Sequence, residues 1–282
     1  MNISKIIFAS ALILFVGCQQ KPTKITVQEP LIGETLTAEA LMKNQPVILD
    51  ARPAFEFNLA HAPGAINVRW EDFSQNNPKS RGLLQADLFA LARRLSLVGV
   101  DPESKVVVLG KGRLGSGEEG RIAWTLKVLG VKEVYTLVHT SYREMNATKE
   151  APLTQNKPYW KPQVAENLSI DFKEFKNFSE SEKKLGVIVD VRSAQEFALR
   201  NLTQSKGVKA QVLNLPWQDF FDDKGLPNKK IASALAENGI TTDTRVIFIS
   251  NHGVRSGAAT YVLQYLGYKK AQNFAGGYEQ WK

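Results

Sequence analysis

The segment VILDARPAFEF at 47–57 returns as VIVDVRSAQEF at 187–197, and this pair decides the fold. Three further blocks recur in the same order: INVRWEDF (66–73) with LNLPWQDF (213–220), VGVDPESKVVVL (98–109) with NGITTDTRVIFI (238–249), and TLKVLGVKEVYTL (125–137) with VLQYLGYKKAQNF (262–274). Four blocks at a spacing of about 140 residues indicate duplication of a whole domain, because solenoid repeats are several-fold shorter.

Short β-branched runs mark the strands of each copy. VILD, KVVVL, VIVD and RVIFI are continuously apolar and flanked by turn residues, which predicts strands buried on both faces of a parallel sheet. Helical periodicity marks 83–99, 121–130, 229–239 and 257–267, each ending in glycine. Strand–helix alternation in each half predicts an α/β protein with two tandem domains, each a small, mostly parallel sheet with helices on both faces.

The two copies set the expected domain limits. NATKEAPLTQNKPYWKP, at 146–162, is polar, contains three prolines and lacks periodicity, so we expect the linker at 147–162. Domain 1 is then expected at 30–146 and domain 2 at 163–282.

The first 18 residues predict a lipoprotein signal peptide. Lys5 precedes the apolar run 6–16, which is too short to span a bilayer as a helix. Phe15-Val-Gly-Cys18 resembles the bacterial lipobox, in which the cysteine is acylated, although leucine is usual where Phe15 stands. We expect secretion across the inner membrane and a lipid anchor on Cys18, which makes the membrane a partner. In a host with two membranes, Gln19 favours the periplasmic face of the outer membrane. The alternative to a lipoprotein signal is a plain secretory signal that happens to contain a cysteine.

Composition excludes several classes of site. The net charge is +8, but no basic run interleaves with aromatic residues, so we expect no nucleic-acid partner. Cys18 is the sole cysteine, which excludes disulfides and cysteine-based metal sites. His61, His139 and His252 lack metal-ligand spacing, so neither a metal nor another cofactor is expected.

Two motifs resemble the rhodanese family of sulfurtransferases in its tandem form, thiosulfate and 3-mercaptopyruvate sulfurtransferases included. They are DARPAFEFNLAHAPGAINV at 50–68 and GVRSGAATYVLQYLGY at 253–268, the latter followed by NFAGGYEQW at 273–281. The resemblance covers nearly everything after residue 30. It implies that a loop at the end of a strand presents backbone N–H groups to an anion. In active members a cysteine opens this loop and carries sulfur as a persulfide.

The corresponding loop here departs from the active pattern. ISNHGVRS, at 249–256, places a serine where the resemblance implies the cysteine. A hydroxyl forms no stable persulfide analogue, so sulfur transfer by that route is expected to be blocked. The predicted anion-binding loop comprises Ser250, Asn251, His252, Gly253, Val254 and Arg255. Arg255 is expected to clamp a thiosulfate-like anion or to form a salt bridge across the domain interface.

Other conspicuous residues have simpler interpretations. A serine hydrolase pair of Ser250 and His252 is disfavoured because no G-x-S-x-G elbow surrounds the serine. The motif pairs Asp50 with Arg52 and Asp190 with Arg192 are expected to order loops. Trp70 and Trp217 recur at matching positions, as packing aromatics.

The first copy departs further from the family pattern. Its loop is longer, Gly110 holds the first loop position, and His139-Thr140 replaces the closing pair Gly276-Gly277. Degenerate first domains are usual in tandem rhodaneses. In the second copy, VKAQ at 208–211 replaces the HAPG of 61–64.

Three functions follow from these observations. The favoured one is a rhodanese-like envelope lipoprotein without sulfurtransferase activity, which binds a small anion or a protein partner through the second-domain loop. The alternatives are an active thiosulfate or 3-mercaptopyruvate sulfurtransferase and a structural envelope scaffold.

Overall fold

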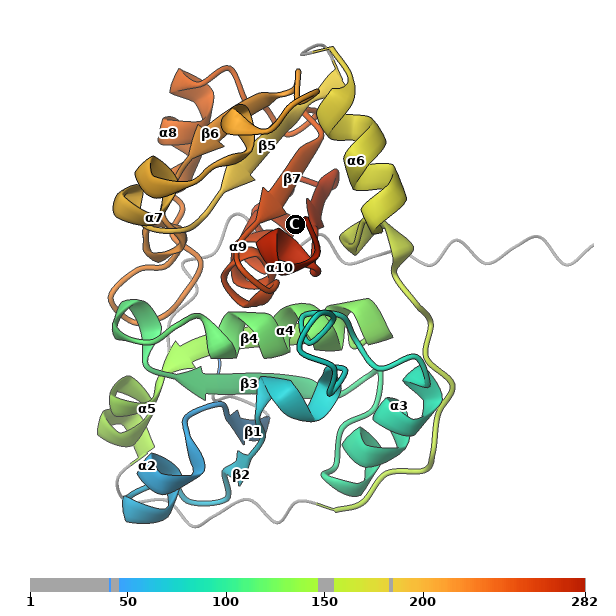
Figure 1. Cartoon of the computed structure of the whole chain (residues 1–282). Coiled ribbons are helices and arrows are strands. Elements are labelled where there is room, and N and C mark those ends of the chain that lie inside the picture. The colour runs from blue at the N-terminus through green and yellow to red at the C-terminus, as the bar shows by residue number, and fades with distance from the viewer. Residues whose placement is uncertain (1–40, 42–45, 147–154, 183–184, 282) are drawn as a thin grey trace, which may run out of the picture.

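Each half of the chain forms its own α/β domain (Figure 1). The computed structural model describes residues 41, 46–146, 155–182 and 185–281. Each domain has a four-stranded sheet, ordered β2-β1-β3-β4 in domain 1 and β6-β5-β7-β8 in domain 2. All six strand pairs are parallel, so the predicted fold class is confirmed.

Domain 1 contains β1 (Val47–Asp50), α2 (Ala54–Leu59), β2 (Ile66–Asn67), η1 (Trp70–Phe73), α3 (Leu88–Leu97), β3 (Lys105–Gly110), η2 (Gly112–Leu114), α4 (Glu118–Leu129), β4 (Glu133–Val138) and α5 (His139–Asn146). Domain 2 contains η3 (Glu166–Leu168), α6 (Phe172–Glu180), β5 (Val187–Asp190), α7 (Ala194–Leu199), η5 (Leu202–Gln204), β6 (Gln211–Asn214), η6 (Trp217–Phe220), α8 (Ile231–Glu237), β7 (Val246–Ile249), α9 (Val254–Tyr265), β8 (Ala271–Asn273) and α10 (Gly277–Gln280). The same sequence of main elements therefore occurs twice.

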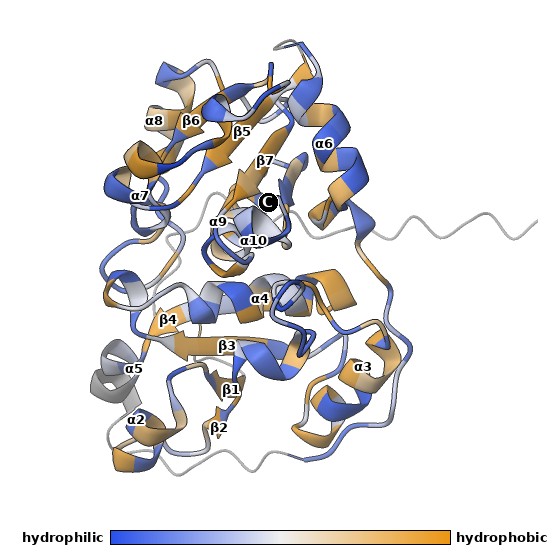
Figure 2. Cartoon of the chain, viewed as in Figure 1, coloured by the Kyte–Doolittle hydropathy of each residue, from blue (hydrophilic) through white to orange (hydrophobic). Residues whose placement is uncertain are grey.

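The register of the central strands is the same in both sheets. Asp50 pairs with Leu109 and Asp190 with Ile249, so equivalent residues end the strands of each copy. Alternate residues of β3 and β7 enter separate hydrophobic clusters on the two faces of their sheets. Burial on both faces explains why these strands are continuously apolar, as the orange strands inside each domain show (Figure 2).

One predicted helix begins later than its periodicity suggested. The apolar pattern starts at residue 83, but α3 begins at Leu88. The Asp87 side chain accepts a hydrogen bond from the Ala90 amide and caps the helix. Leu84, before the cap, forms an antiparallel bridge with Ser74 instead.

Helices α4 and α9 join the domains. They occupy equivalent positions in the two copies and pack against each other at the boundary (Figure 1). The contact is close at Gly120, where a Cβ atom would lie 2.5 Å from that of Ala258. One apolar cluster continues from the first sheet through both helices to the second, so the domains share a core.

The N-terminal predictions lie outside the described residues. The signal peptide, Cys18 and the start of domain 1 all precede residue 41. Within the described part, no helix has the length and apolar character needed to cross a membrane. Of the predicted linker, 155–162 runs without helix or strand and 147–154 is not described, so the domain limits stay predictions.

Candidate anion-binding site

The candidate site is the turn between β7 and α9. Strand β7 ends at Ile249, and α9 begins at Val254. Gly253, between them, has φ of +76°, and a Cβ there would collide with the Ala275 carbonyl. Glycine is therefore required both by backbone conformation and by close approach. The turn lies at the carboxyl edge of the sheet, where open α/β sheets bind ligands.

Neighbouring segments hold the carbonyl groups of this turn. Backbone amides of α10 donate to the carbonyls of Ser250 (from Tyr278, 2.9 Å) and Asn251 (from Glu279, 3.0 Å). Arg121 donates to the Gly253 carbonyl at 2.9 Å.

The backbone amides of the same turn differ from its carbonyl groups. Within the described residues, the N–H groups of Asn251, His252 and Gly253 donate to no acceptor. The first amides of α9 lack intrahelical partners because they open a helix. Consecutive N–H groups at a helix N-terminus are groups that can bind an anion, and we refer to those of this turn as the amide cradle; anion binding here stays a prediction.

Ser250 directly precedes these amides and is 1% exposed. Its Oγ lies 3.0 Å from the Ser256 Oγ and accepts a hydrogen bond from the Ser256 amide at 3.3 Å. No hydrogen bond joins Ser250 to His252 among the described residues, so the structure does not form the pair that the hydrolase alternative needs.

Arg255 forms an ion pair within domain 2, rather than across the domain interface. Its Nη1 and Nη2 donate to the Glu196 carboxylate at 2.7 and 2.8 Å. Asn251 Nδ2 also donates to Glu196, at 3.2 Å. Chiefly through the Arg255 hydrogen bond, the pKa of Glu196 falls to about 2. The Glu196 carboxylate therefore ties both ends of the turn to the start of α7.

His252 lies in the wall between the domains. Its ring stacks on Trp70 with centroids 5.5 Å apart. Arg81 Nη2 lies 3.1 Å from its Nδ1, and Glu279 Oε1 lies 3.6 Å from the same atom. Burial and the nearby charges of Arg81, Arg255 and Arg121 lower the pKa of His252 to about 4, so the ring is neutral at pH 7.

A cavity of about 500 Å³ opens onto the turn from between the domains. Domain 1 contributes Trp70, Glu71, Arg81, Gly115, Ser116 and Glu118 to its lining. Trp217 lines it from domain 2 but is only 2% exposed, as expected of a packing aromatic. Trp70 is only partly buried; it packs against the same apolar cluster as Trp217 and also forms part of the cavity wall.

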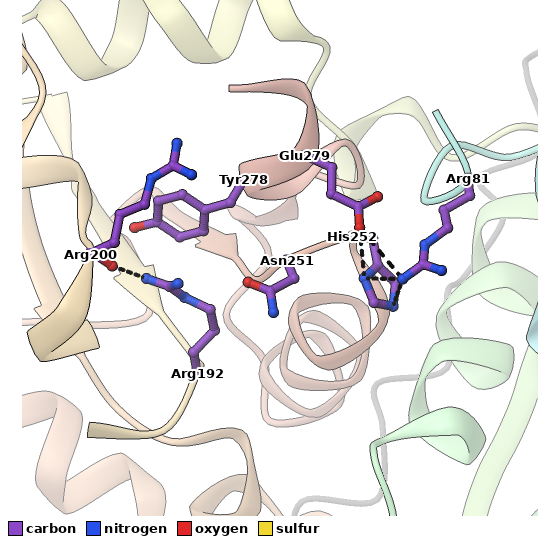
Figure 3. Close-up of a pocket in the computed structure, with 7 residues that line it drawn as sticks. All are labelled: Arg81, Arg192, Arg200, Asn251, His252, Tyr278 and Glu279. Carbon is purple, nitrogen blue, oxygen red and sulfur yellow. Dashed lines mark hydrogen bonds and ion pairs between the residues drawn. The ribbon is translucent and has the colours of Figure 1, made fainter. Parts of the chain in front are cut away.

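A second cavity, of about 240 Å³, shares Arg81, Asn251 and His252 with the first (Figure 3). Arg81 reaches it from domain 1, while Arg192 and Arg200 flank the Tyr278 ring. The Arg192 guanidinium lies 3.8 Å from the centre of that ring. Its Nη2 donates to Asp190 at 2.7 Å, and Arg52 makes the same bond to Asp50. These two pairs order loops in the way expected from the sequence.

The equivalent turn of domain 1 is filled by a side chain. Gly110 occupies the position of Ser250, and Glu119 lies where a side chain at Gly110 would extend. Glu119 Oε1 accepts the Gly112 amide at 2.8 Å, whereas its buried Oε2 has no partner among the described residues. Burial raises the pKa of Glu119 to about 7. Domain 1 thus has no open anion cradle at this turn.

Known proteins match this chain over most of its length. Thiosulfate sulfurtransferases of Azotobacter vinelandii and Pseudomonas aeruginosa are 26% and 27% identical to the chain, over 265 and 256 residues. These matches cover 89% and 83% of this chain and 94% and 87% of the relatives. The crystal structure of SseA from Escherichia coli, a 3-mercaptopyruvate sulfotransferase of rhodanese fold, has a TM-score of 0.68. It is 21% identical, with 85% of this chain and 95% of that one covered.

The family assignment rests on both halves of the chain. The family model for the rhodanese-like domain matches residues 35–146 and again 171–282, which together make up most of the sequence. The two matches correspond to the two parallel sheets, and the chain belongs to the rhodanese sulfurtransferase family in its tandem-domain form.

Proposed function

We propose that this protein binds a small, thiosulfate-like anion in the Ser250–Arg255 turn and does not transfer sulfur. The observation that carries the proposal is the run of N–H groups at 251–253 that donate to no acceptor among the described residues, next to a serine in the first loop position. The free N–H groups suit an oxyanion. The Ser250 hydroxyl is far less acidic than a thiol and forms no stable persulfide analogue, so the covalent step of the family lacks its nucleophile.

The second candidate is an active thiosulfate or 3-mercaptopyruvate sulfurtransferase. The names of the relatives favour it, since both bacterial proteins are called thiosulfate sulfurtransferases. Against it stands the single cysteine of the chain, Cys18, which lies in the predicted signal peptide. A protein partner or a purely structural envelope role would leave the cradle without a ligand.

The proposed location is the cell envelope. The signal sequence and Cys18 support an acylated protein held at a membrane surface, on the periplasmic side of the outer membrane in a Gram-negative host. Mass spectrometry of the protein from its native membrane tests this, because acylation adds a lipid mass to Cys18. An unmodified N-terminal peptide would refute the anchor.

A thiosulfate–cyanide assay on protein lacking residues 1–18 separates the functional candidates. We expect no thiocyanate from the natural sequence and measurable thiocyanate from Ser250→Cys, because that change places a thiol in the cradle. Ser233→Cys is the matched control, since it adds an exposed thiol on α8, away from the turn. Sustained turnover by the natural sequence would refute the proposal.

Anion binding is measured separately, by thermal unfolding with increasing thiosulfate. A ligand that binds only the folded state raises the melting temperature, and the rise grows with the logarithm of ligand concentration above the Kd. We expect this shift in the natural sequence and a smaller one in Arg255→Ala, which releases the turn from Glu196. No shift at any concentration would favour the structural role.

A further inference from the structure

Arg121 is a fully buried arginine that reaches from domain 1 to the anion-binding turn. It lies on α4 and is 0% exposed. Its Nη1 donates to the Gly253 carbonyl at 2.9 Å, and its Nη2 donates to the Gly82 carbonyl at 2.6 Å. The same cation therefore links the turn of domain 2 to a loop of domain 1.

No carboxylate neutralises this cation. Among the described residues, the acceptors of Arg121 are two carbonyl groups and, at 3.4 Å, the Ser74 hydroxyl. Its guanidinium also lies 4.5 Å from the centre of the Trp124 ring. A buried charge without a counter-ion is strongly destabilising, so proteins pair such charges or use them. Burial lowers the pKa of Arg121 to about 9, and no acidic neighbour opposes that change.

The contact with Gly253 places this charge on the carbonyl side of a peptide group whose N–H opens α9. The Gly253 carbonyl belongs to the peptide group whose N–H is that of Val254, the first residue of α9. A cation on the carbonyl oxygen polarises the peptide and makes its N–H a stronger donor. The positive end of the α9 dipole lies at the same place.

We propose that Arg121 supplies the buried counter-charge for the anion in the Ser250–Arg255 turn, so that the binding site is built from both domains. The inference rests on the proposed anion binding. It makes Arg121 a positioning residue, because it acts through the Gly253 peptide. A purely structural Arg121 would hold the loops together and leave anion affinity unchanged.

The first test compares thiosulfate binding to the natural sequence, Arg121→Gln, Arg121→Lys and Arg93→Gln, by thermal shift. Arg93 is the matched control because its guanidinium stacks on Tyr159 at 5.1 Å. We expect Arg121→Gln to raise the apparent Kd about tenfold or more and Arg121→Lys to change it less, because lysine keeps the charge. Arg121→Gln binding as tightly as the natural sequence overturns the inference. If Arg121→Gln does not fold, Arg121→Met takes its place, because methionine fills buried space without a charge.

The second test needs no external anion. In Ser250→Cys, the thiolate itself is the negative charge in the cradle, and its ultraviolet absorbance reports its pKa. We expect the thiol pKa to rise by about one unit when Arg121→Gln is added. A structural Arg121 would leave it unchanged, which refutes the inference. If this rise occurs while the natural sequence binds no thiosulfate, the proposed function fails and the role of Arg121 stands.

Discussion

Replacing Glu119 by glutamine tests how domain 1 fills its own turn. The Glu119 carboxyl is 1% exposed, and its Oε2 has no partner among the described residues. Glutamine has the same shape and keeps an oxygen that can accept the Gly112 amide, but it carries no charge. The substitution therefore removes the titration and leaves the packing in place.

The size of the effect follows from the pKa of Glu119. Burial raises it from 4.5 to about 7, which corresponds to about 3 kcal/mol. Below the lower value the carboxyl is protonated in both the folded and the unfolded chain. As pH rises, the unfolded chain loses this proton first, so the folded state loses stability until pH exceeds about 7. The stability gained by Glu119→Gln should therefore grow by about 3 kcal/mol between pH 4.5 and about 8.

The measurement is the free energy of unfolding in urea across this pH range, for the natural sequence and Glu119→Gln. The matched control is Glu237→Gln, which neutralises an exposed glutamate of α8. Its difference from the natural sequence should stay nearly constant with pH. A pH-independent difference for Glu119→Gln would refute the reasoning, because it would mean that the carboxyl is not held away from water.

Three further predictions concern domain 2. Gly253→Ala should cost about 2 kcal/mol or more in urea unfolding and should weaken thiosulfate binding. Its control, Gly239→Ala, has φ of +75° but open space around it and should cost about 1 kcal/mol. Equal costs would contradict the close contact of Gly253 with Ala275. Glu196→Gln should cost about 1 kcal/mol at pH 7, and this cost should shrink as pH falls below 4.5 and vanish only below about pH 2, because the ion pair with Arg255 is lost as pH falls through the lowered pKa of Glu196. A cost independent of pH in acid titration would contradict this. Phe175→Ala should lower the free energy of unfolding by about 3–5 kcal/mol in chemical denaturation, since the buried ring stacks on Phe274 with centroids 4.0 Å apart. A loss below about 1 kcal/mol would contradict this, because it would mean that neighbouring side chains fill the space left by the ring.

The strands were predictable from sequence because a strand buried on both faces of a sheet is made of consecutive apolar residues. VILD and VIVD coincide with β1 and β5 residue by residue. The start of α3 was harder to predict, because the apolar periodicity extends back to Leu83 and Leu84. Only the cap by Asp87 sets the boundary. Local polar capping, rather than hydrophobic periodicity, decides that boundary.

The turn itself was predictable, but its supporting residues were not. Ser250 and Arg255 lie where the motif placed them, at the end of β7 and the start of α9. Arg81 and Arg121 contact the turn from positions 171 and 132 residues away in sequence. No local pattern reports contacts of that range. Glu196 could have been found, because the repeat places Glu56 at the same position, and Glu56 pairs with Lys111 at 2.9 Å in the first copy.

The packing of α4 against α9 has a consequence for the ancestry of the chain. Because these helices are counterparts in the two copies, each half offers the same surface to the other. Mutual contact between identical patches is the mark of a twofold homodimer. The arrangement is what fusing two such protomers end to end produces. Fusion would also free the two halves to diverge, so that one half could fill its own turn, as Glu119 does in domain 1, while it supports the turn of the other through Arg121.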